Sequence, residues 1–391
     1  MVDTLPHSDW LDRTDLAALV KALGRDNARY VGGAVRDTLL GLPVKDIDIA
    51  TPLDPREVMA RVRKAGFQPI PTGIEHGTIT AILPGGPVEI TTLRHDVSTD
   101  GRRATVAFAS EWQDDAARRD FTINALYADP ETREVFDYFG GKDDLIALRL
   151  RFIGDPHQRI REDHLRILRY FRFQARFGSL PADATAEQAC ADLAATLKGL
   201  SRERVGMEMM NLLGLRDPAP TVARMAELGV LAVVLPEADV AALAALVAEE
   251  QRQGIAPDAL RRLAALLPPD APLAEQVASR FRLSGAQKKR LALAAGRNGQ
   301  DTNARALAYR LGRDAALDRL LLAGASTASL DGWTIPTFPL KGGAIVARGI
   351  KAGPAVARTL QAVEARWIAE GFPDETRVGE LLDVELAKGA A

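Results

Sequence analysis

The sequence predicts an α+β protein, in which a head of mixed strands and helices precedes an all-helical remainder. Up to about residue 150, short β-branched runs alternate with glycine turns and amphipathic helical segments. Beyond that point alanine, leucine and arginine dominate, and proline and glycine punctuate the pattern at Pro181, 218–220, Pro236 and 268–269. The change of pattern predicts that a mixed β-sheet lies entirely within the first part of the chain.

Composition narrows the class of protein without assigning a function. The chain has 391 residues and a formal net charge of −2, so bulk charge gives no sign of a nucleic-acid partner. Its single cysteine, Cys190, excludes an internal disulfide and fits a reducing cytoplasm. No apolar run reaches membrane-spanning length, and the N-terminus lacks the apolar core of a signal peptide. We therefore expect a cytoplasmic protein that does not bind membranes.

The first motif is a strand, a glycine pair and a helix. Residues 15–23 predict a helix that Gly24 ends, and residues 29–31 predict a short strand. Gly32 and Gly33 then allow the backbone to turn sharply and to approach a ligand, before a helix begins near residue 35. Backbone N–H groups at such a turn can hold phosphate, and Arg36 adds a cation. An ordinary turn with an Arg36–Asp37 ion pair is the structural alternative.

The second motif is a pair of aspartates one residue apart. In a strand, Asp46 and Asp48 would project from the same face, while Ile47 and Ile49 turn the other way. Two ionised carboxylates this close repel each other unless a cation lies between them. Oxygen ligands suit Mg²⁺, the usual metal of phosphate chemistry. The alternative is a solvated strand end, and it is the order and spacing of the two motifs that favours the site.

Together these motifs resemble a known family. Val31-Gly-Gly-Ala-Val-Arg-Asp37 followed by Lys45-Asp-Ile-Asp-Ile-Ala50 is similar to the head-domain motif of class II tRNA nucleotidyltransferases, the CCA-adding enzymes, and of the related bacterial poly(A) polymerases. The resemblance implies a catalytic role and Mg²⁺ binding for Asp46 and Asp48, and phosphate positioning by Gly33 and Arg36. Glu89, in a predicted strand at 88–93, resembles the third carboxylate of the family. Arg119, in Arg118-Arg-Asp-Phe-Thr-Ile-Asn-Ala-Leu126, resembles its nucleotide contact.

A further match lies in an arginine-rich helical segment, 161–176. Leu165, Leu168, Phe171 and Ala175 recur at helical spacing and predict a buried stripe. The opposite face is polar and carries Asp163, Arg166, Arg169, Arg172 and Arg176, which by itself is typical of a solvated, ion-paired helix.

The arginine-rich segment resembles the base-selecting Glu-Asp-x-x-Arg-x-x-Arg motif of the family. An ionised aspartate only accepts hydrogen bonds and an arginine only donates them, so Asp163 with Arg166 suits the edges of cytosine and adenine and rejects uracil and guanine. Arg169 and Arg172 would then reach the ribose or the phosphates.

Two more segments complete the expectations. Ser201-Arg-Glu-Arg-Val-Gly-Met-Glu208 resembles the fifth motif of the family, and we expect Arg204 and Glu208 to pair at i, i+4 and brace the helices. Residues 91–118 have no clear period and predict a mobile loop over the nucleotide. In the tail, a helix is expected at 355–370, and three cations are candidates for RNA phosphate contacts: Lys341, Arg348 and Lys351.

The resemblance also implies an organisation and an activity. We expect a nucleotidyltransferase head at 1–150, a helical neck at 151–215, a helical body at 216–330 and a helical tail at 331–391 that contacts tRNA. The implied activity is the addition of C, C and A to the 3′ end of tRNA from CTP and ATP. A poly(A) polymerase, an enzyme that adds only A or only CC, and a catalytically silent RNA-binding protein remain alternatives. All five histidines lie at or before His164, so no C-terminal phosphohydrolase site is expected.

Overall fold

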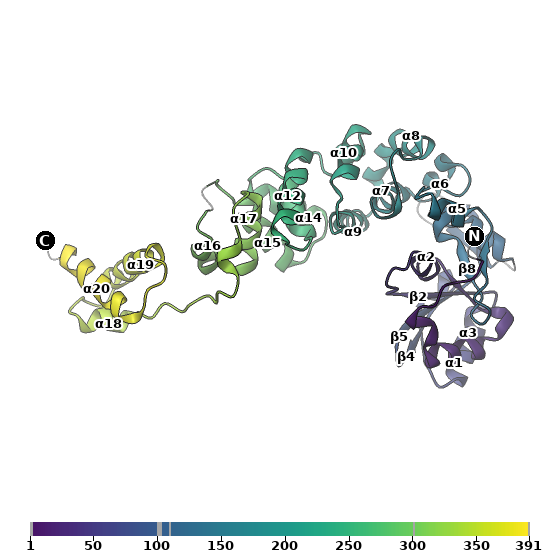
Figure 1. Cartoon of the computed structure of the whole chain (residues 1–391), viewed down its shortest axis with the longest axis horizontal. Coiled ribbons are helices and arrows are strands. Elements are labelled where there is room, and N and C mark those ends of the chain that lie inside the picture. Colours follow the sequence, from purple (N-terminus) through teal and green to yellow (C-terminus); the bar gives the residue numbers. More distant parts are fainter. Residues whose placement is uncertain (1–2, 100–103, 109–110, 300–301, 390–391) are drawn as a thin grey trace. The chain divides into compact units, whose positions relative to one another are not determined.

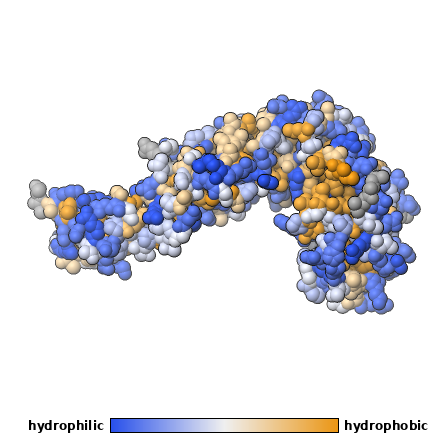
Figure 2. All heavy atoms as spheres, viewed as in Figure 1, coloured by the Kyte–Doolittle hydropathy of each residue, from blue (hydrophilic) through white to orange (hydrophobic). Residues whose placement is uncertain are grey.

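The computed structural model describes residues 3–99, 104–108, 111–299 and 302–389 (Figure 1). The chain divides into two compact units, Met1–Pro236 and Glu237–Ala391. Domain boundaries near residues 150, 215 and 330, which would divide these units further, stay predictions. In the view of Figure 2, hydrophilic residues cover most of the surface of each unit, and an apolar area is visible on the first.

The first unit is built on a seven-stranded mixed sheet, as the sequence predicted. The strand order is β3-β4-β5-β2-β1-β8-β9. β2 and β5 run parallel, and all other neighbouring strands pair antiparallel. The strands are β1 (Arg29–Val31), β2 (Ile47–Thr51), β3 (Gln68–Gly73), β4 (Thr78–Leu83), β5 (Gly86–Thr92), β8 (Leu126–Ala128) and β9 (Val135–Asp137).

Short helices accompany this sheet, and the sequence marks one end of two of them. The expected first helix forms as α1, and Gly24, with φ of 93°, ends it. Asp54 caps α3 by accepting a hydrogen bond from the Arg56 N–H, and Pro55 takes the first helical position. The helices are α1 (Thr14–Leu23), α2 (Gly33–Leu39), α3 (Pro55–Lys64), α4 (Trp112–Ala117) and α5 (Gly141–Ile146), with a 3-10 turn at Thr122–Asn124.

The segment 91–118, predicted as a mobile loop over the nucleotide, contains regular elements that the sequence did not indicate. β6 (Arg94–Thr99) and β7 (Ala104–Phe108) form a two-stranded antiparallel sheet, and α4 follows. The central charged run of this segment, 100–103, lies outside the described residues. No clear alternation marks these strands, because the backbone hydrogen bonds of an antiparallel pair do not require alternating side chains.

The helical part of the first unit begins directly after the head. Its helices are α6 (Pro156–Glu162), α7 (Arg166–Phe177), α8 (Ala184–Asp192), α9 (Arg202–Leu213), α10 (Ala219–Glu227) and α11 (Val230–Val234). The predicted stripe of α7 is buried at Leu165, Leu168 and Phe171, and Ala175 is half-buried. Phe173 on the same helix lies 5.3 Å from Phe121 of the head, centroid to centroid. Aromatic packing thus joins α7 to the segment that follows α4.

The second unit is all-helical, as expected. Its helices are α12 (Val240–Gln253), α13 (Ala259–Leu266), α14 (Ala271–Arg280), α15 (Gly285–Ala295), α16 (Ala304–Leu311), α17 (Arg313–Leu322), α18 (Gly342–Ala347), α19 (Pro354–Ala369) and α20 (Glu375–Gly389). The helix expected at 355–370 is α19. Trp367 is buried in an apolar cluster to which α16, α18, α19 and α20 contribute. Among the described residues, no helix combines the length and the apolar character that crossing a membrane requires.

Candidate active site

The glycine turn connects β1 to α2 and lies next to the side chain of Arg119. Gly32 has φ of 69°, a conformation that favours glycine. A Cβ at this position would lie 3.4 Å from Arg119 Nη1. Gly33 is the first residue of α2 and has an ordinary φ. The turn therefore brings the N-terminus of α2 next to the guanidinium of Arg119, which lies almost ninety residues further along the chain.

Three carboxylates gather at the neighbouring strands β2 and β5. Asp48 lies on β2 and is directly paired in register with Glu89 on β5. Ile47 and Ile49 are buried on the other side of β2, as the alternation predicted. Asp46 precedes the strand rather than belonging to it, because β2 begins at Ile47. The parallel pairing of two strands far apart in sequence, and not the Asp-x-Asp spacing alone, brings the third carboxylate to the pair.

This arrangement leaves Asp48 short of positive charge. Burial and the neighbouring charges of Glu89 and Asp46 raise the pKa of Asp48 to about 6, although the positive charge of Arg119 opposes the shift. Asp48 is half-buried, whereas Asp46 and Glu89 are exposed. A carboxylate that is destabilised by its neighbours in this way gains from a cation at the same place.

Arg119 is held by groups that leave one of its nitrogens directed at the glycine turn. Its Nε and Nη2 donate to Asp115 Oδ2 at 3.3 and 3.1 Å, and Tyr127 Oη lies 3.2 Å from Nε. Asp115 is buried on α4. Burial opposes its ionisation, but Arg119 and Arg118 together lower the pKa of Asp115 to about 2. Asp115 therefore stays ionised and fixes the direction of Arg119.

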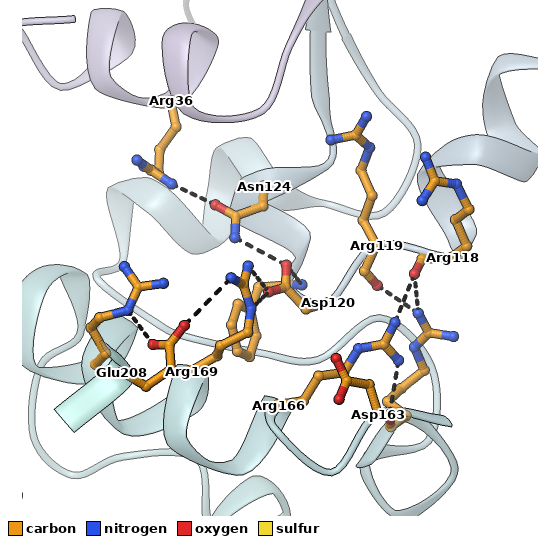
Figure 3. A network of polar contacts seen from close by, with 12 residues as sticks. Arg36, Arg118, Arg119, Asp120, Asn124, Asp163, Arg166, Arg169 and Glu208 are labelled. Carbon is orange, nitrogen blue, oxygen red and sulfur yellow. Dashed lines mark hydrogen bonds and ion pairs between the residues drawn. The ribbon is translucent and has the colours of Figure 1, made fainter. Parts of the chain in front are cut away.

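Asp120 connects the head to α7. Its Oδ2 accepts from Arg169 Nε and Nη2 at 2.8 and 2.5 Å, and its Oδ1 accepts from Asn124 Nδ2 at 3.0 Å. Asn124 Oδ1 in turn accepts from Arg36 Nη1 at 2.6 Å (Figure 3). Arg36 is buried and also pairs with Asp37 at 2.7 Å, the ion pair considered as the structural alternative. This continuous polar network runs from α2 to α7.

The prediction that Arg204 and Glu208 pair with each other was wrong, because each residue has a different partner. Glu208 is buried on α9 and accepts from Arg172 Nε at 2.6 Å. Arg204 Nη2 donates to Asp163 Oδ2 at 2.8 Å. Arg204 and Glu208 of α9 therefore pair with the arginine-rich segment and not with each other. A pair within α9 would leave Asp163 and Arg172 without these partners.

The Arg166 backbone N–H donates to the Asp163 carbonyl at 3.0 Å, but the side chains of these two described residues have different partners. Arg166 Nη1 donates to Glu162 Oε2 at 2.6 Å and to the Arg159 carbonyl at 2.8 Å, and its Nη2 donates to the Arg118 carbonyl at 3.1 Å. Asp163 ends α6 in an extended conformation, so α7 begins anew at Arg166 and helical spacing does not relate the two side chains. Both lie at the same junction of α6 and α7 (Figure 3).

Four residues that organise the site were missed at the sequence level: Asp115, Asp120, Asn124 and Glu162. Asp120 and Asn124 lie inside the segment 118–126, which was noted only for its arginines. An acid directly after two arginines is a signal that could have found Asp120. No comparable signal in the sequence points to Asp115 of α4, because its partner Tyr127 lies on strand β8.

Two family models and several known proteins are similar to parts of this chain. Residues 28–151 match the family model described as the poly(A) polymerase head domain, and residues 183–241 match a probable RNA- and SrmB-binding site of polymerase A. The human mitochondrial CCA tRNA nucleotidyltransferase 1 is 45% identical over 203 residues, which are 51% of this chain and 46% of that protein. Residues 28–151 and 183–241 of this chain are thus similar to domains of the poly(A) polymerase family. The CCA-adding enzyme of Geobacillus stearothermophilus is 40% identical over 52% of the chain and 49% of its own length.

Solved structures of the family extend the likeness along the chain. A CCA-adding enzyme from Bacillus stearothermophilus, in complex with CTP, is similar over 96% of this chain and 98% of its own, with a TM-score of 0.70 and 26% identity. A Thermotoga maritima CCA-adding enzyme complexed with tRNA has the same fold, with a TM-score of 0.70, 20% identity and coverage of 95% and 94%. The sequence matches to the curated relatives, by contrast, span about half of their length.

Nucleotidyltransferases of this family generally need a divalent metal, and carboxylate oxygens are ligands that such a metal accepts. Among the described residues, no group of three or more His, Cys, Asp or Glu side chains is arranged to hold a metal by itself. Asp46 and Asp48 would thus supply two ligands and leave the others to water and phosphate. Mg²⁺ is bound in this way, through one or two carboxylates and the phosphates of a substrate.

Proposed function

We propose that this chain adds C, C and then A to the 3′ end of tRNA, using CTP and ATP, without a nucleic-acid template and with release of pyrophosphate. The observation that carries the proposal is the carboxylate cluster of Asp46, Asp48 and Glu89 next to the glycine turn and Arg119. Such a cluster serves nucleotidyl transfer, since it concentrates negative charge where a metal and a triphosphate must meet.

Asp46 and Asp48 are proposed to hold Mg²⁺. The ion, when bound, neutralises phosphate charge and lowers the pKa of a coordinated hydroxyl. Asp48 is fixed by its strand, while Asp46 lies just outside it and can adjust to the ligand geometry. Glu89 lies beside Asp48 and is proposed to accept the proton of the tRNA 3′-hydroxyl or to orient that group.

The phosphates and the ribose are proposed to lie between the glycine turn and α7. Gly33 offers a backbone N–H at the start of α2, and Arg119 offers the guanidinium nitrogen that points at the turn. Arg36 is buried and already paired, so its role would be to orient the turn through Asn124 rather than to neutralise phosphate alone. Arg169 and Arg172 are half-buried on α7 and are proposed to contact the nucleotide from that side.

Asp163 and Arg166 are proposed to select the base. Asp163 remains an acceptor, with Arg204 on one oxygen and the Leu165 N–H on the other, and each oxygen can accept a further bond. Arg166 would donate to the ring nitrogen of cytosine or adenine. Both groups are held in place before a nucleotide arrives, which lowers the entropic cost of binding.

One assay tests the proposed activity against its alternatives. The protein is incubated with tRNA transcripts that end before the first C of the tail, after the second C, or with a complete tail, and the added nucleotides are sequenced. We expect CCA, then A, then no addition. Long adenosine tails would indicate a poly(A) polymerase, and addition of only A or only CC would indicate a partial activity. No addition to any transcript would contradict the proposal and leave an RNA-binding protein.

We also propose that the chain works in the cytoplasm. The support is its single thiol, Cys190, which is buried and cannot form an internal disulfide. Fractionation of cells that carry a tagged chain tests this proposal, and recovery of the chain from a membrane or an oxidising compartment would contradict it.

A further inference from the structure

Arg159 on α6 binds the main chain of the segment that carries Arg119. The side chain of Arg159 is only 9% exposed. Its Nη2 donates to the carbonyl of Arg118 and also to the carbonyl of Arg119, the latter at 2.9 Å. Its Nη1 forms an ion pair with Glu162 one turn later. One planar guanidinium therefore connects two consecutive carbonyls of the head to a carboxylate of the helical segment.

Arg166 binds the same two acceptors as Arg159. It donates to Glu162 Oε2 at 2.6 Å and to the Arg118 carbonyl at 3.1 Å, and it also binds the Arg159 carbonyl at 2.8 Å. Glu162 thus carries two guanidiniums on one carboxylate. The Arg118 carbonyl accepts from both arginines, and Figure 3 shows these two contacts at Arg118. The four groups form a closed cluster in which none can move without disturbing the others.

We propose that Arg159 is a positioning residue that sets the distance between the phosphate contact and the base contact of the nucleotide site. The inference rests on the proposed function, in which Arg119 binds phosphate and Arg166 reads the base. The carbonyl of Arg119 is held by Arg159, while its side chain extends to Asp115 and the glycine turn. Arg159 therefore acts on the nucleotide through two other residues and touches no reacting atom.

The physical consequence of losing Arg159 follows from the shared acceptors. Without its guanidinium, the Arg119 carbonyl loses this donor, and Glu162 is left with Arg166 as its partner. Arg166 would then be drawn toward Glu162 and become less available to a base. Arg119 would be less well fixed, so both ends of the nucleotide would be bound less tightly.

The test compares Arg159→Gln and Arg159→Lys with a control, Arg280→Gln. Arg280 lies in the second unit and forms a similar two-nitrogen pair with Glu237, at 3.0 and 2.8 Å. For each protein we would measure CTP and ATP affinity by calorimetry, kcat and KM for tRNA extension, misincorporation of UTP and GTP, and thermal unfolding.

We expect Arg159→Gln to weaken CTP and ATP binding by about tenfold, to raise KM more than it lowers kcat, and to increase misincorporation. Arg159→Lys keeps the charge beside Glu162 but lacks the planar fork, so an intermediate effect is expected. Arg280→Gln should leave affinity and base choice unchanged.

A merely structural role gives a different result. It would lower the unfolding temperature of the Arg159 variants and the fraction of active protein, but leave affinity, KM and base choice of the folded fraction unchanged, and this would overturn the inference. If Arg159→Gln fails to fold, Arg159→Lys decides by the same measurements. A wild-type chain that binds CTP but does not extend tRNA would contradict the proposed activity alone, because the calorimetric comparison still tests Arg159. A chain that does not bind CTP would overturn both.

Discussion

Asp48 and Asp120 are carboxylates of the same head domain, yet their surroundings shift their pKa values in opposite directions. Burial together with the charges of Glu89 and Asp46 raises the pKa of Asp48 to about 6. Burial also disfavours ionisation of Asp120, but the charge of Arg169 and the hydrogen bonds from Asn124 and Arg169 outweigh it and lower the pKa of Asp120 to about 2. The difference lies in the partners and not in the degree of burial.

The comparison separates two kinds of buried charge. Asp120 belongs to a network in which the chain itself supplies the opposite charges, so its role is to hold elements together. Asp48 lies where the chain has placed further carboxylates, and in the proposed site a bound cation supplies the positive charge that Arg119 alone does not provide. Carboxylates whose pKa is raised by burial and by like charges are frequent at functional sites, which supports the proposed role of Asp48.

The largest effect on activity is expected from a substitution of Asp48, the carboxylate that is proposed to bind the cation. Asp48→Asn should lower the proposed CCA addition by at least about 10³-fold, because the proposed metal site loses one of its ligands. The unfolding temperature at pH 7 should stay the same or rise, since a repulsive charge is removed. Incorporation of radiolabelled CTP and thermal unfolding measure the two effects. Glu57→Gln, on the surface of α3, is the control, and full activity of Asp48→Asn would contradict the assignment.

The next largest effect is expected on stability, from a substitution of Asp120, whose charge Arg169 balances. Asp120→Ala should destabilise the folded chain by about 3 kcal/mol, because Arg169 keeps a half-buried charge with only the more distant Glu208, at 4.0 Å, as a partner. Urea unfolding measures the change. The double variant Asp120→Leu with Arg169→Met should recover much of the loss, since neither charge then remains. Equal destabilisation of the single and double variants would show that the ion pair is not the cause.

A smaller effect is expected on specificity. Asp163→Ala should reduce discrimination of CTP and ATP against UTP and GTP by roughly 10- to 100-fold, because the acceptor for the amino group is lost. Sequencing of extended tRNA in mixtures of all four nucleotides measures base choice. Glu203→Gln, at an exposed position of α9, is the matched control. Unaltered selectivity in Asp163→Ala would remove Asp163 from the role.

The smallest effect is a pH dependence of stability. The folded-state pKa of Asp48, about 6, lies above its usual value of 3.8, so the native state keeps this proton while the unfolded state releases it. The contribution of Asp48 to the free energy of unfolding should therefore fall as pH rises from about 4 to about 6 and stay low above that range.

Mg²⁺ should reverse this loss. The increase in unfolding temperature on adding Mg²⁺ should be present at pH 7.5, weaken as the pH falls through about 6, and be absent in Asp48→Asn. An increase that is the same at pH 4.5 and 7.5 would place the metal elsewhere.

The sequence by itself determined the mixed sheet of the head, the helical remainder and the Asp46–Asp48 pair. These depend on local pattern: β-branched alternation, helical spacing and glycines at turns. Motif order also located Glu89, Arg119 and the arginine-rich segment. The hairpin at 94–108 was not predicted, because its backbone pairing has no side-chain signature.

The tertiary structure alone decided which charges meet. The parallel pairing of β2 with β5 sets Glu89 beside Asp48, and the approach of α6, α7 and α9 to the head assigns Asp120 to Arg169, Asp163 to Arg204, and Glu162 to both Arg159 and Arg166. An arginine fork can pair with any acid within its reach, so spacing along one helix cannot choose among partners. Distances between segments far apart in the chain make that choice, because Coulomb attraction and desolvation both depend on position in space.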